Sequence, residues 1–332
     1  MDFFSSSLLN WFAANGRDLP WRGCGDAYRI WLSEVILQQT RIAQGLDYWY
    51  RFLQELPTVE ALAAADEDKV LRLWQGLGYY SRARNLHAAA KQVVALGGFP
   101  DTAEGLRQLK GVGDYTAAAV ASFAFGRDVA AVDGNVFRVL ARHFGIETPI
   151  NSSGARKEFT ALAQALLPKG RSADFNQALM DFGALCCTPA SPRCEECPVS
   201  ETCVALRTGR VSALPVKLKK TKVKERHFIY VYVRCGDEVA LHRRPAGDIW
   251  QGLYEPWLLE DASVPAVDGR LTLLRQQVKH VLTHRILLAD FYLLETTMRP
   301  ELPNGYFWVA ESQRDQYAVP RLVELLYEAL EC

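Results

Sequence analysis

Glu34 carries a carboxyl group on what the residue spacing predicts to be a largely apolar helix face. Its neighbours at helical spacing are Ile30, Trp31, Leu37 and Gln38. Burial among such side chains disfavours the charged form and raises the pKa of a carboxyl group. Glu34 is then a candidate general acid, and the alternative is a buried glutamate paired with an arginine such as Arg22 or Arg41.

A second carboxyl group, that of Asp133, stands at the start of the expected helix 134–142. Aspartate at this position commonly accepts hydrogen bonds from the first N–H groups of a helix. These donors and the helix dipole favour its ionised form. Taken alone, Asp133 is therefore interpreted as a helix N-cap.

Four cysteines share one short segment, with the spacing Cys187-x6-Cys194-x2-Cys197-x5-Cys203. Four thiolates so close together favour a metal site. Disulfides are disfavoured because the sequence shows no secretion signal and its other cysteines are scattered. Zinc sites usually present two compact cysteine pairs, which this spacing does not. An iron–sulfur cluster is therefore modestly favoured over zinc, with the adjacent Cys186 as an alternative ligand to Cys187. Because the chain has no glycine-rich dinucleotide fingerprint, a structural or sensing cluster is preferred to electron transfer.

The segment 109–116, Leu-Lys-Gly-Val-Gly-Asp-Tyr-Thr, lies between two helical stretches. Gly111 and Gly113 free the backbone to turn sharply, and the following helix start offers N–H groups to an anion. This pattern is a helix–hairpin–helix signature, although a bare Gly-x-Gly is also typical of an ordinary tight turn. Backbone amides can hold a DNA phosphate without a basic surface.

Helices separated by Gly and Pro account for the first two hundred residues, where no convincing strand is found. Ser81 caps a predicted helix over 82–96, which Gly97-Gly98 ends. Further helices are expected to begin at Tyr28, Asp66, Tyr115 and Gly134.

Strand-like segments begin only after a basic stretch. Residues 217–226 hold six basic side chains and one acidic one, so we interpret them as a linker, either a solvated connector or a strap that follows phosphates. The β-branched and aromatic runs 227–233 and 286–294 predict strands, and 321–330 predicts a helix. The sequence thus predicts an all-α region over 1–216 and a small α+β domain over 227–332.

The composition is that of a globular protein, with 332 residues of which 49% are hydrophobic. Lys+Arg and Asp+Glu both total 38, which argues against a uniformly basic surface. Residues 1–226 carry 28 basic and 23 acidic side chains and 227–332 carry 10 and 15, giving +5 and −5. No stretch is apolar enough for a bilayer and the start lacks a signal-peptide pattern, so we expect a soluble intracellular protein without a membrane partner.

Several of these motifs together resemble the helix–hairpin–helix DNA glycosylases that carry a 4Fe-4S cluster. The hairpin, the segment 132–136 (Val-Asp-Gly-Asn-Val) and the cysteine loop 187–203 carry this resemblance. The segments 31–40 (Trp-Leu-Ser-Glu-Val-Ile-Leu-Gln-Gln-Thr) and 76–85 (Gly-Leu-Gly-Tyr-Tyr-Ser-Arg-Ala-Arg-Asn) are similar to the MutY-type adenine DNA glycosylases. The cysteine spacing is also that of the family, which implies a 4Fe-4S cluster on Cys187, Cys194, Cys197 and Cys203.

The resemblance implies roles for individual residues. Glu34 matches the acid that protonates N7 of a flipped adenine, and Asp133 matches the carboxylate that stabilises the oxocarbenium-like sugar. Tyr115 and Asn135 match residues of the catalytic pocket, and Gln39 and Tyr79 match residues inserted beside the lesion. The expected contacts to DNA or lesion are Arg22, Gln38, Gln39, Tyr79, Leu109, Gly111, Val112, Gly113, Leu282, Thr283 and His284.

Tyr115 separates this chain from its bifunctional relatives, which have a lysine nucleophile at that position. Tyrosine cannot form the Schiff base that strand cleavage needs, and Lys110 is expected to face phosphate from the hairpin. A monofunctional glycosylase follows. The alternatives are a glycosylase-lyase of the endonuclease III kind and a non-catalytic, cluster-bearing DNA-binding or redox-sensing module.

The C-terminal part resembles the MutT-like domain with which this family reads 8-oxoguanine. The segment 247–256 (Gly-Asp-Ile-Trp-Gln-Gly-Leu-Tyr-Glu-Pro) carries the likeness. The magnesium-binding Arg-Glu-x-x-Glu-Glu run of true Nudix hydrolases is absent, so we expect binding without hydrolysis. Leu282-Thr283-His284 replaces the family's Phe-Ser-His loop, keeping a hydroxyl and an imidazole but losing a ring, and His284 is alternatively a core histidine.

The resulting expectation is a multidomain DNA-repair enzyme. An all-α glycosylase region (1–216) with a hairpin near 109–116 precedes a basic linker (217–226) and a Nudix-like lesion-recognition domain (227–332). It would excise adenine opposite 8-oxoguanine or guanine in double-stranded DNA and leave an abasic site. On the family resemblance we expect a monomer, in the cytoplasm if the source is bacterial.

Overall fold

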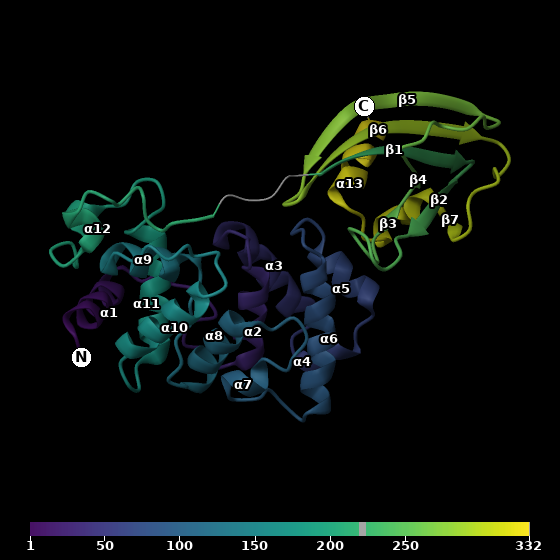
Figure 1. Ribbon diagram of the computed structural model, residues 1–332. Coiled ribbons are helices and arrows are strands. Elements are labelled where there is room, and N and C mark those ends of the chain that lie inside the picture. Colours follow the sequence, from purple (N-terminus) through teal and green to yellow (C-terminus); the bar gives the residue numbers. More distant parts are fainter. Residues whose placement is uncertain (219–223, 332) are drawn as a thin grey trace. The chain divides into compact units, whose positions relative to one another are not determined.

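A computed structural model describes residues 1–218 and 224–331 (Figure 1). The chain divides into two compact units, Met1–Ala63 with Ala88–Lys219 and Ala64–His87 with Lys220–Cys332. Residues 219–223 of the predicted linker lie outside the described residues, and strand β1 begins at Lys224, inside the range predicted as linker.

The first unit is helical, and the described residues up to 218 contain no strand. Its helices are α1 (Phe3–Asn15), α2 (Ala27–Ile36), α3 (Ile42–Glu55), α4 (Val59–Ala64), the end of α6 (Ser81–Ala95), α7 (Ala103–Leu106), α8 (Asp114–Phe125), α9 (Gly134–Phe144), α10 (Ala155–Leu166), α11 (Ser172–Leu185) and α12 (Val204–Arg207), with a 3-10 turn at Cys194–Glu196. The predicted all-α region is confirmed. No described helix has the length and apolar character that crossing a membrane requires.

Local capping explains where two helices of the site begin. Asp26 accepts hydrogen bonds from the N–H groups of Tyr28 and Arg29 and thereby starts α2, which carries Glu34. Asp133 starts α9 in the same way, and Gly145 ends that helix in the left-handed conformation at φ 69°. The start of each helix is therefore fixed by residues that the sequence makes visible.

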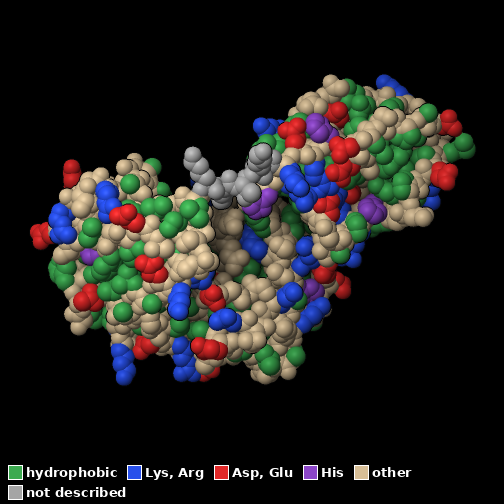
Figure 2. Space-filling view, in the orientation of Figure 1, with side chains coloured by type: hydrophobic (Ala, Val, Ile, Leu, Met, Phe, Trp, Pro, Cys, Tyr) green, Lys and Arg blue, Asp and Glu red, His purple; other side chains and the backbone are tan. Residues whose placement is uncertain are grey.

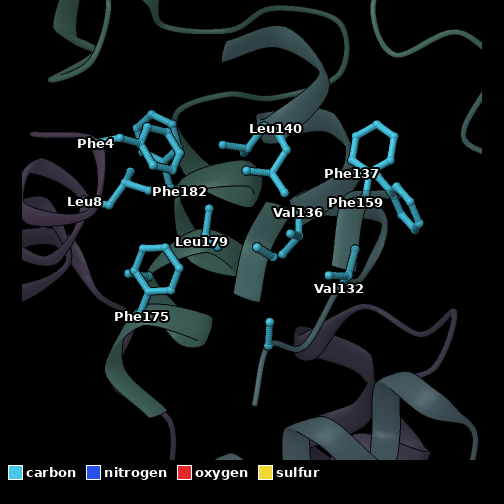
Figure 3. Packing of buried hydrophobic residues seen from close by; sticks show 14 of the residues in the cluster. Phe4, Leu8, Val132, Val136, Phe137, Leu140, Phe159, Phe175, Leu179 and Phe182 are labelled. Atoms are coloured by element: carbon cyan, nitrogen blue, oxygen red, sulfur yellow. The ribbon is translucent and has the colours of Figure 1, made fainter. Parts of the chain in front are cut away.

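The core next to the site is built from α1, α9, α10 and α11 (Figure 3). Its aromatic members are Phe4, Phe137, Phe159, Phe175 and Phe182. Phe137 and Phe159 meet edge to face at 4.9 Å between ring centroids, which joins α9 to α10. Because α9 and α11 pack into this core, the residues at their ends are held in fixed places.

The second unit contains a seven-stranded mixed sheet with α13 (Arg321–Leu330) against one face (Figure 1). The strands are β1 (Lys224–Cys235), β2 (Glu238–Arg243), β3 (Tyr254–Glu255), β4 (Trp257–Glu260), β5 (Arg270–Val281), β6 (Arg285–Thr296) and β7 (Tyr306–Ala310). The main order is β3-β2-β1-β6-β5, while β4 pairs with β1 and β7 with β2. The two strands predicted from sequence lie within β1 and β6, which pair in parallel, so the α+β prediction is confirmed.

The helical segment Ala64–His87 belongs to this second unit, although the sequence places it in the first domain. Its helix α5 (Glu67–Trp74) presents Asp68, which accepts hydrogen bonds from the Tyr254 hydroxyl at 2.8 Å and from Arg243 at 3.1 Å. Farther along, the Arg84 guanidinium donates to the carbonyl of Gln251 at 2.6 Å. Such pairs, more than 160 residues apart, leave no local signal in the sequence.

Candidate active site

A cavity in the first unit brings Glu34 and Asp133 together, about a hundred residues apart in sequence. Its wall is formed by the segment before α2, by α2 and the residues after it, and by α8, the start of α9 and α11. The lining side chains include Arg17, Trp21, Arg22, Glu34, Arg41, Tyr115, Asp133, Asn135, Gln177 and Met180. Four of them, Glu34, Tyr115, Asp133 and Asn135, are the predicted catalytic residues.

Glu34 lies on α2 with its carboxyl group at the cavity wall. The Tyr115 hydroxyl donates a hydrogen bond of 2.7 Å to its Oε2 atom. Burial raises the pKa of Glu34 to about 7, the Asp133 charge adds to this, and the Tyr115 hydrogen bond and the Arg22 charge oppose it. The arginine pair considered as the alternative is not formed by Arg22, whose guanidinium binds Asp181 instead. A carboxyl group with this pKa is protonated in a substantial fraction near neutrality and can donate a proton.

Asp133 is both the N-cap of α9 and a wall of the cavity. Its Oδ1 atom accepts hydrogen bonds of 2.8 Å from the N–H groups of Asn135 and Val136. Its Oδ2 atom accepts one of 2.8 Å from the Asn135 side-chain amide. Burial raises the pKa of Asp133, while these three donors favour the carboxylate. The predicted cap is therefore present, and it places a hydrogen-bonded carboxyl group at the cavity wall.

A chain of hydrogen bonds joins Asp133 to the cysteine segment. The Arg138 guanidinium donates from Nη2 to the Asn135 side-chain oxygen at 2.8 Å and from Nε to the Cys187 carbonyl at 2.8 Å. Nη2 also donates to the Gly183 carbonyl of α11 at 2.7 Å. Arg138 thus fixes Asn135, and through it Asp133, to the start of the cysteine segment.

The four predicted cysteine ligands line one small pocket. Cys186, which is buried, and Arg142 also line it. Arg142 donates from Nη1 to the Cys187 sulfur at 3.5 Å and to the Thr188 carbonyl at 2.7 Å. No group of three or more His, Cys, Asp or Glu side chains in the described ranges is placed to hold a single metal ion. Four sulfurs around a common space, with an arginine beside one of them, are the donor set that would hold an anionic iron–sulfur cluster.

The hairpin between α7 and α8 needs glycine at one of its two glycine positions. Gly111 has a φ of 75°, whereas Gly113 has an ordinary φ of −91°, so only Gly111 supplies the sharp turn. Gly113 is instead the N-cap of α8 and makes no side-chain cap, which leaves the first N–H groups of α8 to other acceptors. Leu109 and Val112 are buried, so their side chains anchor the hairpin and only their backbone is available to DNA.

Gln38 and Gln39 follow α2 and differ in their surroundings. The Gln38 amide donates to the Thr116 hydroxyl on α8 at 3.2 Å, which ties this turn to the helix after the hairpin. Gln39 is exposed and has a φ of 57°, a left-handed conformation that is rare outside glycine. The strained turn presents the Gln39 side chain outward, as expected of a residue that contacts DNA.

The predicted lesion-reading residues meet within the second unit. The hydroxyls of Tyr79 and Thr283 are 2.7 Å apart, and both residues are exposed. Thr283 and His284 form the tip of the β5–β6 turn, which the N–H of Leu282 closes by donating to the Arg285 carbonyl at 2.8 Å. Leu282 packs against the core of this unit, and the exposed His284 is not a core histidine. Leu282 is partly buried, and it lines a cavity of the second unit together with Tyr79, Thr283 and His284.

Three residues at or behind the cavity wall, Arg17, Gln177 and Asp181, were not singled out from the sequence. Arg17 and the predicted contact residue Arg22 share the buried carboxylate of Asp181, and Gln177 adds an amide to the cavity wall. The only available signal was the polar character of Gln177 and Asp181 on α11, where most neighbours are apolar. A buried aspartate on such a helix requires cationic partners, but the sequence does not say which ones.

Basic and acidic side chains are interspersed on the molecular face shown in Figure 2. This arrangement agrees with the net charge of zero. Backbone N–H groups of the hairpin can bind a phosphate without a general basic surface.

Family comparisons agree with the fold. Residues 32–165 match the family described as HhH-GPD superfamily base excision DNA repair protein, and residues 229–329 match the NUDIX domain. A solved structure of a thermostable thymine-DNA glycosylase superposes with a TM-score of 0.58 at 33% identity, covering 62% of this chain and 95% of that one. The class is thus that of helix–hairpin–helix base excision repair proteins, with a NUDIX domain added.

Comparison with individual protein sequences identifies a family within this class. Adenine DNA glycosylase of Mus musculus is 46% identical over 226 residues, which are 64% of this chain and 44% of the mouse protein. The chain therefore spans less than half the length of that relative. Adenine DNA glycosylase of Buchnera aphidicola subsp. Schizaphis graminum is 32% identical over 254 residues, covering 76% of this chain and 73% of the relative. The chain belongs to the adenine DNA glycosylase family.

Proposed function

We propose that this protein excises adenine opposite 8-oxoguanine or guanine in double-stranded DNA by hydrolysing the N-glycosidic bond. The observation that carries the proposal is the pair of unlike carboxyl groups in one cavity, Glu34 with a pKa of about 7 and Asp133 among N–H donors. Glu34 protonates the departing base, which makes it a better leaving group. Asp133 stabilises the positive charge that develops on the sugar, as the second carboxylate does in glycoside hydrolysis.

The enzyme acts as a monofunctional glycosylase. Among the described residues, those lining the cavity include three arginines but no lysine. Tyr115, at the position of the nucleophile in bifunctional relatives, is instead hydrogen-bonded to Glu34. Without an amine to form a Schiff base, the reaction ends with base release and an abasic site, and water supplies the hydroxyl group.

DNA is held by the hairpin, and the lesion is read by the second unit. The uncapped N–H groups at the start of α8 bind a phosphate of the strand that holds the adenine. Tyr79 and Thr283 offer paired hydroxyls to the base opposite the adenine. Their exposure and their short contact support this role, because both hydroxyls can exchange their mutual hydrogen bond for one to a base edge.

Cys187, Cys194, Cys197 and Cys203 hold a 4Fe-4S cluster, which braces the loop 187–203 as a structural element. Arg142 and Arg138 bond the start of this loop and place positive charge beside it. Because the NUDIX domain lacks the acidic magnesium-binding run, it recognises the lesion without hydrolysing a nucleotide. The protein acts as a monomer on DNA.

A single-turnover assay tests the activity. Duplexes with adenine opposite 8-oxoguanine, guanine or thymine are incubated with excess protein, and each sample is divided into portions with and without alkali. We expect cleavage only after alkali, fastest opposite 8-oxoguanine. Glu34→Gln should abolish excision and retain DNA binding, while the exposed Glu158→Gln should behave as the unaltered protein. Strand breaks without alkali, with borohydride trapping of a covalent complex, would instead indicate a glycosylase-lyase.

The lesion-reading role of Thr283 has its own test. Thr283→Val keeps the shape but removes the hydroxyl, so the rate on the 8-oxoguanine duplex should approach that on the guanine duplex. Thr283→Ser restores a hydroxyl and should restore the preference. Equal preferences in all three proteins would assign lesion reading to other residues.

A further inference from the structure

Asp181 on α11 is a charged residue that is fully buried, with none of its surface exposed. Its Oδ2 atom accepts hydrogen bonds from Arg22 Nη1 at 2.8 Å and from the Arg17 backbone N–H at 2.9 Å. Its Oδ1 atom accepts one from Arg22 Nη2 at 2.8 Å and one from Arg17 Nε at 2.9 Å. A buried carboxylate is costly unless it is paired in this way, so the arrangement is specific.

Of the three residues Arg17, Arg22 and Asp181, it is Arg22 whose electrostatic effect on Glu34 is resolved. It lines the same cavity as Glu34 and is one of the charges that act on Glu34. The two parallel bonds to Asp181 fix the plane of its guanidinium, and Nη1 also donates to the Arg17 carbonyl at 2.7 Å. The guanidinium carbon of Arg22 lies over the Phe12 ring, 5.3 Å from its centre. Arg22 thus has little freedom to move toward or away from Glu34.

We propose that Asp181 is a positioning residue that holds the Arg22 guanidinium in the cavity wall shared with Glu34 and offsets its positive charge. The inference rests on the proposed excision of adenine. It adds a residue that does not touch the substrate and acts only through Arg22.

The charged and titratable groups around Glu34 allow the sign of the effect to be worked out. Those sharing its cavity are Tyr115 from α8, Asp133 from the start of α9, and Arg17, Arg22 and Arg41 from the segments flanking α2. The part of α11 that lines the cavity is uncharged: Gln177, Met180 and Ala184. Arg22 lowers the pKa of Glu34 and Asp133 raises it. Removing the Asp181 charge leaves Arg22 uncompensated, which favours the Glu34 carboxylate and lowers the pKa further.

The test compares single-turnover excision by Asp181→Asn and by the unaltered protein on the adenine·8-oxoguanine duplex over a pH series. Because Glu34 acts in its protonated form, the rate falls as pH rises through its pKa. We expect the midpoint of this fall in Asp181→Asn to move down by about one pH unit. Above neutrality the variant should then be about tenfold slower, and at lower pH the two rates should converge.

Two controls separate this effect from damage to the fold. Asp181→Glu keeps the charge and should keep the midpoint. Asp174→Asn removes a charge from the exposed face of the same helix, where Asp174 pairs with Arg171, and should change neither the midpoint nor the melting temperature. If Asp181→Asn does not fold, the double variant Arg17→Gln/Asp181→Asn removes one charge of each sign and still leaves Arg22 without its carboxylate. Its midpoint should also fall.

A rate that drops equally at every pH would mean that Asp181 only stabilises the fold, and an unchanged profile would mean that it has no influence on Glu34. Either result overturns the inference while leaving adenine excision by the unaltered protein in place. If the unaltered protein releases no adenine at any pH, the proposed function itself is wrong.

Discussion

Glu34 is the residue on whose proton the proposed reaction depends. Because burial raises its pKa to about 7, we expect the single-turnover rate to fall as pH rises through neutrality and the carboxyl group ionises. The rate should also fall toward low pH, where Asp133 takes up a proton and loses its negative charge. A pH series on the adenine·8-oxoguanine duplex should therefore give a bell-shaped dependence of the rate on pH. Its two limbs report the coupled ionisation of Glu34 and Asp133. A flat profile across neutrality would contradict these roles.

Tyr115 acts on Glu34 through one hydrogen bond, and this gives a prediction of opposite sign to that for Asp181. The bond favours the carboxylate and lowers the pKa of Glu34. Tyr115→Phe removes the donor, so the pKa should rise and the alkaline limb of the profile should move to higher pH. Tyr50→Phe, at an exposed tyrosine, is the matched control. A midpoint that falls or stays fixed would show that the hydroxyl does not act on Glu34.

At the scale of elements, the site depends on a close contact between α9 and α11. A Cβ atom at Gly183 on α11 would lie 2.6 Å from Asn135 Cβ and 3.2 Å from its Cα. Gly183→Ala should therefore push Asn135 and Asp133 aside and destabilise the fold by about 1–3 kcal/mol, the usual cost of overpacking. Urea unfolding and the excision rate measure the two effects. Gly154→Ala, where a Cβ meets nothing within 4 Å, should leave both unchanged.

The hairpin offers a test in which its two glycines behave differently. Gly113 has an ordinary φ and open space beside it, so Gly113→Ala should fold normally but place a methyl group where a phosphate would approach α8. We expect weaker binding to an unreactive duplex, measured by fluorescence anisotropy, at an unchanged melting temperature. Gly111→Ala should instead lose about 1–2 kcal/mol of stability, because its φ of 75° is unfavourable for alanine. Unchanged DNA binding by Gly113→Ala would remove this helix start from the interface.

At the scale of the whole molecule, the cysteine loop is part of the core of the first unit. Cys186 and Val199 belong to the same buried cluster as Phe182 on α11. Cys197→Ser should therefore lower the iron content and the visible absorbance, and should reduce the melting temperature of the protein. Cys235→Ser, in the second unit, is the matched control. Full iron content and an unchanged melting temperature in Cys197→Ser would refute the proposed ligand set.

The second unit joins parts of the chain that are far apart in sequence. The segment Ala64–His87 reads as one more helical stretch, yet it forms a compact unit with the C-terminal sheet. Its contacts there include polar ones, such as Gln75 Nε2 donating to Glu324 Oε1 at 2.7 Å. The partner of an isolated polar residue on a helix surface cannot be predicted from the sequence, because many donors and acceptors would satisfy it equally well. Local sequence patterns consequently do not reveal this contribution.

Local sequence patterns predicted the helical first region, the strands within β1 and β6, the helix 321–330 and several helix starts. Capping residues, glycines and the change from helical to alternating periodicity act between near neighbours and are therefore readable along the chain. Family motifs added the identity of the carboxyl pair and the cysteine set. The three-dimensional packing shows in addition that Tyr115 donates to Glu34, that Arg22 binds Asp181, and that Leu282 packs against the core of its unit. These outcomes depend on which side chains packing brings together, and burial sets the pKa of Glu34 only after that packing is complete.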